Sequence, residues 1–155
     1  FYRIILANTL DSLPDYLHWI ARHNQLGRPV DVTFGLPSMR GRLFENPHLY
    51  PPLEGLRERV TEAVELAKRL NIAPILHHAP ACAVPTLTEH AVCLHIETFQ
   101  LSAIDGARED MSHEGDARYG AACEGCSGKA RGCHGVPAAY WERDADAVEA
   151  WLRQV

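Results

Sequence analysis

The sequence feature that most constrains this chain is a stretch of 31 residues, 105–135, that cannot build a hydrophobic core. Its only bulky apolar side chains are Met111 and Tyr119, beside ten charged residues and seven of the chain's eleven glycines. Ordering each residue costs roughly 1–2 kcal/mol of conformational entropy, so such a stretch is either disordered or held by something other than a core. It contains three of the chain's five cysteines in a C-x2-C-x6-C pattern: Cys123, Cys126 and Cys133. Segments with little hydrophobic core are commonly stabilised by a bound metal, so we expect a metal centre here.

Three local thiolates leave a fourth ligand to be supplied from elsewhere in the chain. The candidates are Cys82, Cys93, His78 and His134. Cys82 follows a predicted strand and lies between prolines, whereas Cys93 lies in an apolar run. We therefore expect Cys82 to be the fourth ligand and Cys93 to be a buried structural thiol, the usual fate of a lone cysteine among aliphatic residues.

The predicted metal centre could be an iron–sulfur cluster, which cysteines commonly bind. Two other interpretations of the cysteines compete with it. A dithiol redox pair at Cys123 and Cys126 would explain a bare C-x2-C, but that motif belongs before a helix, and here its flank is rich in glycine. A structural zinc ion held by four cysteines, or by three cysteines and a histidine, is the stronger rival. From spacing alone, zinc fits at least as well as an iron–sulfur cluster.

The first half of the chain has the alternation of parallel βαβ units. Strands rich in apolar residues alternate with helices whose apolar residues recur at helical spacing. The first helix has Ser12 as its N-cap, and the second ends at Asn71 in a left-handed conformation. The predicted elements are a strand at 2–7, a helix to about 23, a strand at 30–34, a helix at 53–70 and a strand from 73 to 77 or 78.

The remaining segments are less regular. Residues 37–52 are expected to form a long loop, and residues 92–97 and 99–104 are candidate strands. A last helix begins at Asp144 and is anchored by Trp151. The predicted organisation is therefore α/β: residues 1–104 with parallel strands, a loop-rich cysteine-bearing segment at 105–143, and a terminal helix at 144–155.

Composition excludes several classes of function. Hydrophobic residues make up 46% of the chain and charged residues 23%, which is ordinary globular composition. The net charge is −5 and the basic residues are scattered, so nucleic acid and anionic membranes are poor partners. No apolar run approaches the roughly 20 residues that span a bilayer, and the first residues lack the layout of a signal peptide. We expect a cytoplasmic protein.

Two segments carry a resemblance to a known family. Residues 119–126 read YGAACEGC, and residues 133–140 read CHGVPAAY. These resemble the C-terminal region of radical SAM proteins that carry an auxiliary [4Fe–4S] cluster: C-x2-C, a short basic spacer, then C-x-G-V and a tyrosine. The order of strands and helices upstream, with PACAVP at residues 80–85, is similar to the second half of the partial (β/α) barrel of such proteins.

The resemblance implies half of a partial (β/α) barrel followed by a cluster-binding extension. It implies that Cys82 joins the three C-terminal cysteines on a [4Fe–4S] cluster, and that Asn8 contacts the sugar of S-adenosylmethionine (SAM). In the complete protein, SAM would be cleaved reductively and the resulting radical would take hydrogen from a substrate, either a peptide or a small molecule. The auxiliary cluster would relay an electron or coordinate that substrate.

The chain departs from this family in one respect. The C-x3-C-x2-C motif that holds the SAM-cleaving cluster does not occur in it. We expect that motif upstream of Phe1, in a missing N-terminal half-barrel, and we expect the chain alone to be inactive.

Two alternatives belong to other functional classes. One is a structural zinc module within an α/β binding protein. The other is a hydrolase in which His77 or His78 serves as the base, but the sequence has no nucleophile elbow and no glycine-rich phosphate loop. For these two histidines we expect one half-buried and one solvated side chain.

Overall fold

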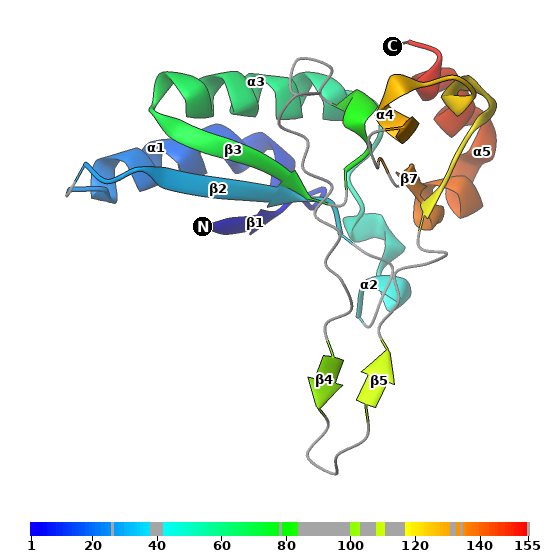
Figure 1. The fold of residues 1–155 in the computed structure, drawn as a ribbon, viewed down its shortest axis with the longest axis horizontal. Helices are drawn as coiled ribbons and strands as arrows, with labels where there is room; N and C mark the ends of the chain where they lie inside the picture. Colours follow the sequence, from blue (N-terminus) through cyan, green and yellow to red (C-terminus); the bar gives the residue numbers. More distant parts are fainter. Residues whose placement is uncertain are drawn as a thin grey trace.

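A computed structural model gives the fold of the 155-residue chain (Figure 1). It describes residues 1–25, 27–37, 42–77, 79–83, 100–102, 108–110, 117–130, 133 and 135–154.

A three-stranded parallel sheet organises the first half. It comprises β1 (Tyr2–Ile4), β2 (Val30–Gly35) and β3 (Ile72–His77) in the spatial order β1-β2-β3. Ile4, Gly35 and His77 stand in register, so the carboxyl ends of the three strands meet at one edge. The predicted parallel arrangement is confirmed.

Strand β1 is shorter than the sequence predicts, because a turn follows it closely. The Thr9 hydroxyl accepts a hydrogen bond from the Leu6 amide at 2.8 Å, and the Ala7 amide donates to the Leu49 carbonyl at 2.8 Å. Residues 6 and 7 therefore leave the sheet, and only the Ile5 amide continues the ladder, to the Gly35 carbonyl.

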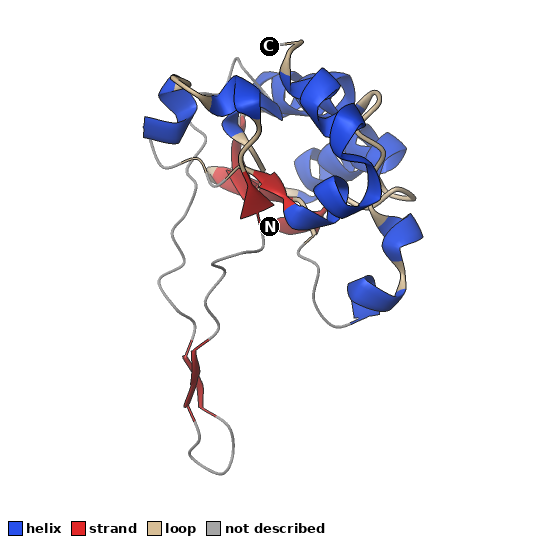
Figure 2. Ribbon diagram, turned by 90° about the vertical axis from the view of Figure 1, so that its right-hand side faces the viewer, coloured by secondary structure: helices blue, strands red, loops and turns tan. Residues whose placement is uncertain are grey.

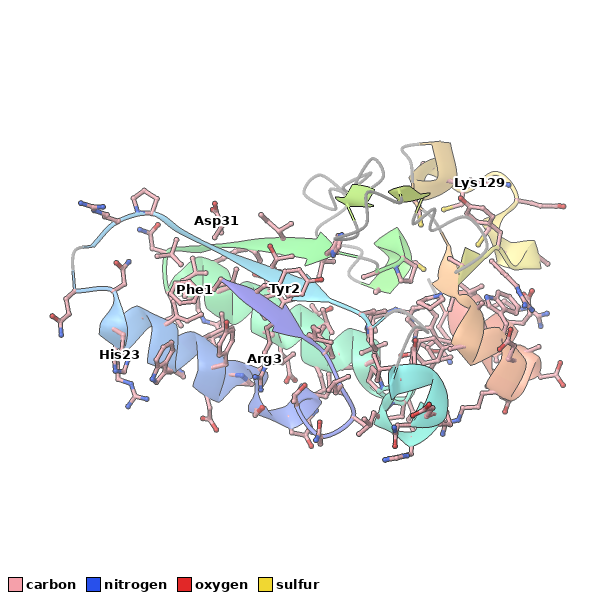
Figure 3. All side chains as sticks on the ribbon, turned by 90° about the horizontal axis from the view of Figure 1, so that it is seen from below. Phe1, Tyr2, Arg3, His23, Asp31 and Lys129 are labelled. Carbon is pink, nitrogen blue, oxygen red and sulfur yellow. The ribbon has the colours of Figure 1, made fainter. Side chains whose placement is uncertain are left out.

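Helices α1 (Leu13–His23) and α3 (Leu56–Arg69) cover one face of the sheet. Right-handed crossovers between strands taken in the order β1, β2, β3 place both connecting helices on the same face, and Figure 3 shows them there. Val32, Phe34 and Leu76 are buried on the covered face. Asp31 and Ala73, which alternate with them, are exposed.

The helix ends differ in part from the predictions. Ser12 precedes α1 as predicted, but its hydroxyl donates to the Thr9 carbonyl and does not cap the helix. The reason is that a 3-10 helix, η1 (Leu10–Ser12), runs directly into α1. Helix α3 begins at Leu56, not residue 53, because Gly55 is left-handed with φ of 71°. Asn71 has φ of 57°, which confirms the predicted left-handed stop.

The segment between β2 and α3 includes α2 (Arg42–Glu45) and the 3-10 helix η2 (Pro47–Leu49). Two tyrosines join its end to the terminal helix. The Tyr50 hydroxyl donates to the Pro37 carbonyl at 3.0 Å, and the Tyr140 hydroxyl donates to the Pro51 carbonyl at 2.9 Å. The two rings meet edge to face with centroids 5.5 Å apart. The C-terminal helix thereby shares the hydrophobic core of the sheet.

The terminal helix α5 (Ala138–Leu152) begins six residues earlier than predicted and bends at Asp144. Asp144 has non-helical φ and ψ of −163° and 92°, and its carboxylate accepts a hydrogen bond from the Ala147 amide at 2.9 Å. Asp144, where the sequence predicts the helix to begin, is therefore an N-cap inside a longer helix and caps only its second half. Trp151 is buried in the core, as predicted.

The other described elements are short. Strands β4 (Gln100–Ser102) and β5 (Arg108–Asp110) pair antiparallel, as do β6 (Ala117–Arg118) and β7 (Val136–Pro137). The predicted strand at 92–97 lies outside the described residues. Among the helices that the structure describes, none is long and apolar enough to cross a membrane.

Candidate metal centre

Four cysteines come to the C-terminal end of the parallel sheet from four local structures. Cys82 lies in the 3-10 helix η3 (Ala81–Ala83), shortly after β3. Cys123 ends the 3-10 helix η5 (Ala121–Cys123), Cys126 precedes α4 (Ser127–Ala130), and Cys133 follows α4. Figure 1 shows α4, β7 and α5 on the side toward which the strands point, and Figure 2 looks onto that end.

One small pocket is lined by all four of these cysteines. Its apolar walls include Val136 and Leu152, and Tyr119 and Lys129 also line it. The structure thus brings together the residues that the sequence analysis selected as ligands: Cys82, Cys123, Cys126 and Cys133. Their role as metal ligands stays a prediction. Cys93, His78 and His134, the other ligand candidates, lie outside the described residues.

Backbone hydrogen bonds shape the C-x2-C-x6-C segment. The Cys126 amide donates to the Cys123 carbonyl at 3.2 Å, and the Cys133 amide donates to the Gly128 carbonyl at 3.0 Å. Gly125, inside the C-x2-C turn, has φ of 74°, a left-handed conformation that glycine adopts without strain. The turn and the return of the chain across α4 bring the three local cysteines to one pocket.

Gly135 supports Cys133 in a way that requires glycine. Its φ is 89°, and a Cβ atom at this position would clash with the Arg118 carbonyl oxygen of the paired strand. Its amide donates to the Cys133 sulfur at 3.4 Å. Hydrogen bonds from backbone amides to cysteine sulfurs are a recognised means of tuning metal–thiolate centres.

Arg57, on α3, fixes the position of Cys82. Its Nε donates to the Cys82 carbonyl at 3.1 Å, and its Nη2 donates to the Trp151 carbonyl at 3.0 Å. The guanidinium also lies 4.4 Å from the centre of the Trp151 ring, a cation–π contact. Sequence reasoning missed Arg57, because its partners are 25 and 94 residues away and no local pattern connects them.

Burial makes the Cys82 thiol an unusually weak acid. Loss of solvation is the largest effect, and together with the nearby Cys133 and Cys123 sulfurs it raises the pKa of Cys82 to about 12, against the opposing influence of Arg57. The metal-free thiol is therefore protonated at neutral pH, and a metal must displace its proton in order to bind.

The donor set suits two kinds of metal centre. Four thiols are the usual ligands of both structural zinc and [4Fe–4S] clusters. In the part of the chain that the structure describes, no group of three or more His, Cys, Asp and Glu side chains has the arrangement that holds a metal ion. A tetrahedral zinc ion brings its thiolates to about 3.8 Å from one another, whereas in a cluster each thiolate binds a separate iron.

Tyr119 and Lys129, which both line the pocket, contact each other. The Tyr119 hydroxyl donates to the Cys133 carbonyl, and the Lys129 ammonium lies 4.6 Å from the centre of the Tyr119 ring. The Lys129 amide donates to the Cys126 carbonyl at 3.1 Å. In Figure 3, Lys129 lies at the same end of the molecule as the sulfur atoms.

A second polar group lies at the carboxyl edge of the sheet. The Tyr2 hydroxyl and His77 Nδ1 are 2.7 Å apart, and they meet across β2 because Gly35 has no side chain there. His77 is buried, not half-buried or solvated as expected, because the Tyr2 ring packs edge-on against it. Burial also raises the pKa of Tyr2. His78 lies outside the described residues.

Asn8, the residue that the resemblance assigns to SAM, is exposed in the turn after β1. The turn lies on the carboxyl side of the sheet, where open α/β sheets bind their ligands.

Comparisons of this sequence with protein-family models, with curated proteins and with solved structures found no match.

Proposed function

We propose that this chain binds a [4Fe–4S] cluster and forms the C-terminal portion of a radical SAM enzyme. The observation that carries the proposal is that four cysteines, one of them 41 residues before the next, line one pocket beyond the carboxyl ends of a parallel sheet. The ligands are Cys82, Cys123, Cys126 and Cys133.

The residues around the pocket fit an iron–sulfur cluster. The donor set consists of thiols alone, apolar side chains line the walls, and the Gly135 amide donates to the Cys133 sulfur. Arg57 holds the backbone of Cys82 in place from α3. When bound, such a cluster supplies one-electron transfer or an iron site for a substrate.

The carboxyl edge of the sheet is the proposed cavity wall for SAM and the substrate. The three parallel strands would form half of a partial (β/α) barrel, with the other half supplied by an N-terminal half-barrel. Asn8 would contact the SAM sugar, and a peptide or a small molecule would be the substrate. The support for this part is the parallel order of the strands, the aligned carboxyl ends and the sequence resemblance.

Anaerobic reconstitution with iron and sulfide tests the cluster. We expect brown protein with about four irons per chain, broad absorption at the blue end of the visible range, and loss of that absorption on reduction. Replacing Cys123 and Cys126 together by alanine should abolish the colour. The matched control, Cys93→Ala, should retain it. If the double variant and the wild type take up equal iron, these cysteines are not the ligands.

Zinc is the alternative, because it shares the four-thiol donor set. In that case the protein should stay colourless, bind one zinc ion with high affinity and fail to hold iron and sulfide. This result would refute the cluster and favour a structural zinc site in an α/β binding protein.

The radical SAM assignment needs its own test, on the longest natural protein that contains this chain. With SAM and dithionite we expect formation of 5′-deoxyadenosine. The 155-residue chain, which has no C-x3-C-x2-C, should form none. A longer protein that holds the cluster but leaves SAM intact would refute the enzyme class and leave the metal centre standing.

A further inference from the structure

Lys129 contacts residues of the cysteine pocket through both its backbone and its side-chain ammonium. Its backbone amide donates to the Cys126 carbonyl, and its ammonium lies over the ring of Tyr119. Tyr119 in turn donates its hydroxyl to the Cys133 carbonyl. The backbone of Lys129 is therefore linked to Cys126 and its ammonium is linked through Tyr119 to Cys133, and Lys129 lines the same pocket as the four cysteines.

The charge of Lys129 is not neutralised by an acidic neighbour among the described residues. The ion pairs found there join other residues, such as Arg118 with Glu142 and Lys68 with Glu65. Glu149, an acidic residue that approaches η5, accepts a hydrogen bond from the Ala121 amide. The field of the ammonium at the pocket is reduced by solvent, because Lys129 is exposed, but a paired carboxylate does not cancel it.

We propose that Tyr119 positions the Lys129 ammonium so that its charge raises the reduction potential of the metal centre. This inference rests on the proposed iron–sulfur cluster. Lys129 and Tyr119 are positioning residues in it, not ligands.

The physical basis is the change in net charge on reduction. Four thiolates already make a cluster site strongly negative, and reduction adds one more negative charge. A positive charge held at the pocket favours the reduced state more than the oxidised state, so the potential rises. The aromatic ring contributes by keeping the flexible lysine side chain at the pocket.

The test is the midpoint potential of the reconstituted protein, measured for the wild type and for variants. We expect Lys129→Gln to disfavour the reduced state by roughly threefold to tenfold, where tenfold corresponds to 59 mV for one electron. Lys129→Arg should keep the wild-type potential. Tyr119→Leu should lower the potential, and combining it with Lys129→Gln should add little, because both changes remove the same charge from the pocket.

Lys68→Gln is the matched control, because Lys68 is the chain's other lysine and pairs with Glu65 on the surface of α3. It should leave the potential unchanged. The effect of Lys129 should also shrink as ionic strength rises, since the side chain is exposed.

The possible failures are distinguishable. Wild-type protein that takes up no iron and sulfide refutes the proposed function and this inference together. Wild-type protein with an intact cluster, whose potential is the same in Lys129→Gln as in Lys68→Gln at low salt, refutes this inference alone. Circular dichroism and iron content show that each variant has folded and is loaded before its potential is compared.

Discussion

At the scale of single residues, the pocket depends on backbone conformations that only certain side chains allow. Gly135 combines a left-handed φ, a close approach to the Arg118 carbonyl and an amide that donates to the Cys133 sulfur. Gly27 also has a positive φ, of 57°, but an added Cβ atom there would meet no other atom. Comparing the two glycines therefore distinguishes the effect of backbone strain from the effect of a steric clash.

We therefore expect Gly135→Ala to destabilise the protein by more than Gly27→Ala does. The second change should cost about 1–2 kcal/mol of unfolding free energy, from the left-handed conformation alone. The first adds a collision with backbone and should also reduce metal content. Urea denaturation and metal analysis measure both effects. Equal losses of stability and unchanged metal content in Gly135→Ala would contradict the described packing.

The raised pKa of Cys82 gives a second prediction at this scale. A thiolate is the reactive form of cysteine, and at pH 8 a pKa of about 12 leaves roughly a thousandfold less thiolate than the ordinary value of 9.0. In metal-free protein, iodoacetamide should therefore label Cys82 far more slowly than the exposed Cys126. Mass spectrometry of the peptides gives both rates.

The pH dependence of labelling provides the check on this prediction. The rate at Cys82 should continue to rise above pH 10, because the folded thiol titrates with a pKa of about 12. The stability that burial of the neutral thiol contributes is present below pH 9 and is lost as the pH rises toward 12. A labelling rate that levels off near pH 9 would mean that Cys82 is solvated.

At the scale of elements, the sequence predicted regular periodicity better than boundaries. Helices α1 and α3 were predictable because their apolar residues recur at helical spacing and pack on one sheet. The start of α5 was not, because residues 138–143 carry no capping residue and follow Pro137 directly. Asp144, a good capping residue, marked the interior bend and not the beginning of the helix.

The cap at Asp144 is testable against a neighbour. Asp144→Ala removes the acceptor of the Ala147 amide and should cost about 0.5–2 kcal/mol of unfolding free energy, the usual effect of losing an N-cap. Asp146→Ala, at an exposed position on the same helix, should change stability little. Thermal denaturation of the two variants decides this, and equal effects would show that Asp144 contributes no cap.

At the scale of the whole molecule, local spacing revealed only part of the candidate site. The C-x2-C-x6-C pattern predicts the three clustered ligands, and the place of Cys82 after a strand predicts the fourth. Arg57 and Lys129 were not found, because their roles depend on contacts that only the tertiary structure creates: Arg57 joins η3 to α5, and Lys129 needs the Tyr119 ring. Long-range contacts of ordinary surface residue types have no local signal.

The division of the chain into a self-supporting part and a metal-dependent part gives the last prediction. Helix α3 buries Leu56, Val60 and Val64 in the core and does not need the pocket to stay folded. The described residues 117–130 have little core of their own: Gly128 is buried, and the side chains around it are mostly exposed.

Removal of the metal should therefore raise amide hydrogen exchange across residues 117–130 and leave α3 protected, because local opening follows the local loss of stabilising contacts. Metal-loaded protein is the reference. If residues 117–130 remain as protected as α3 after metal removal, the metal does not hold this segment, whichever metal binds there.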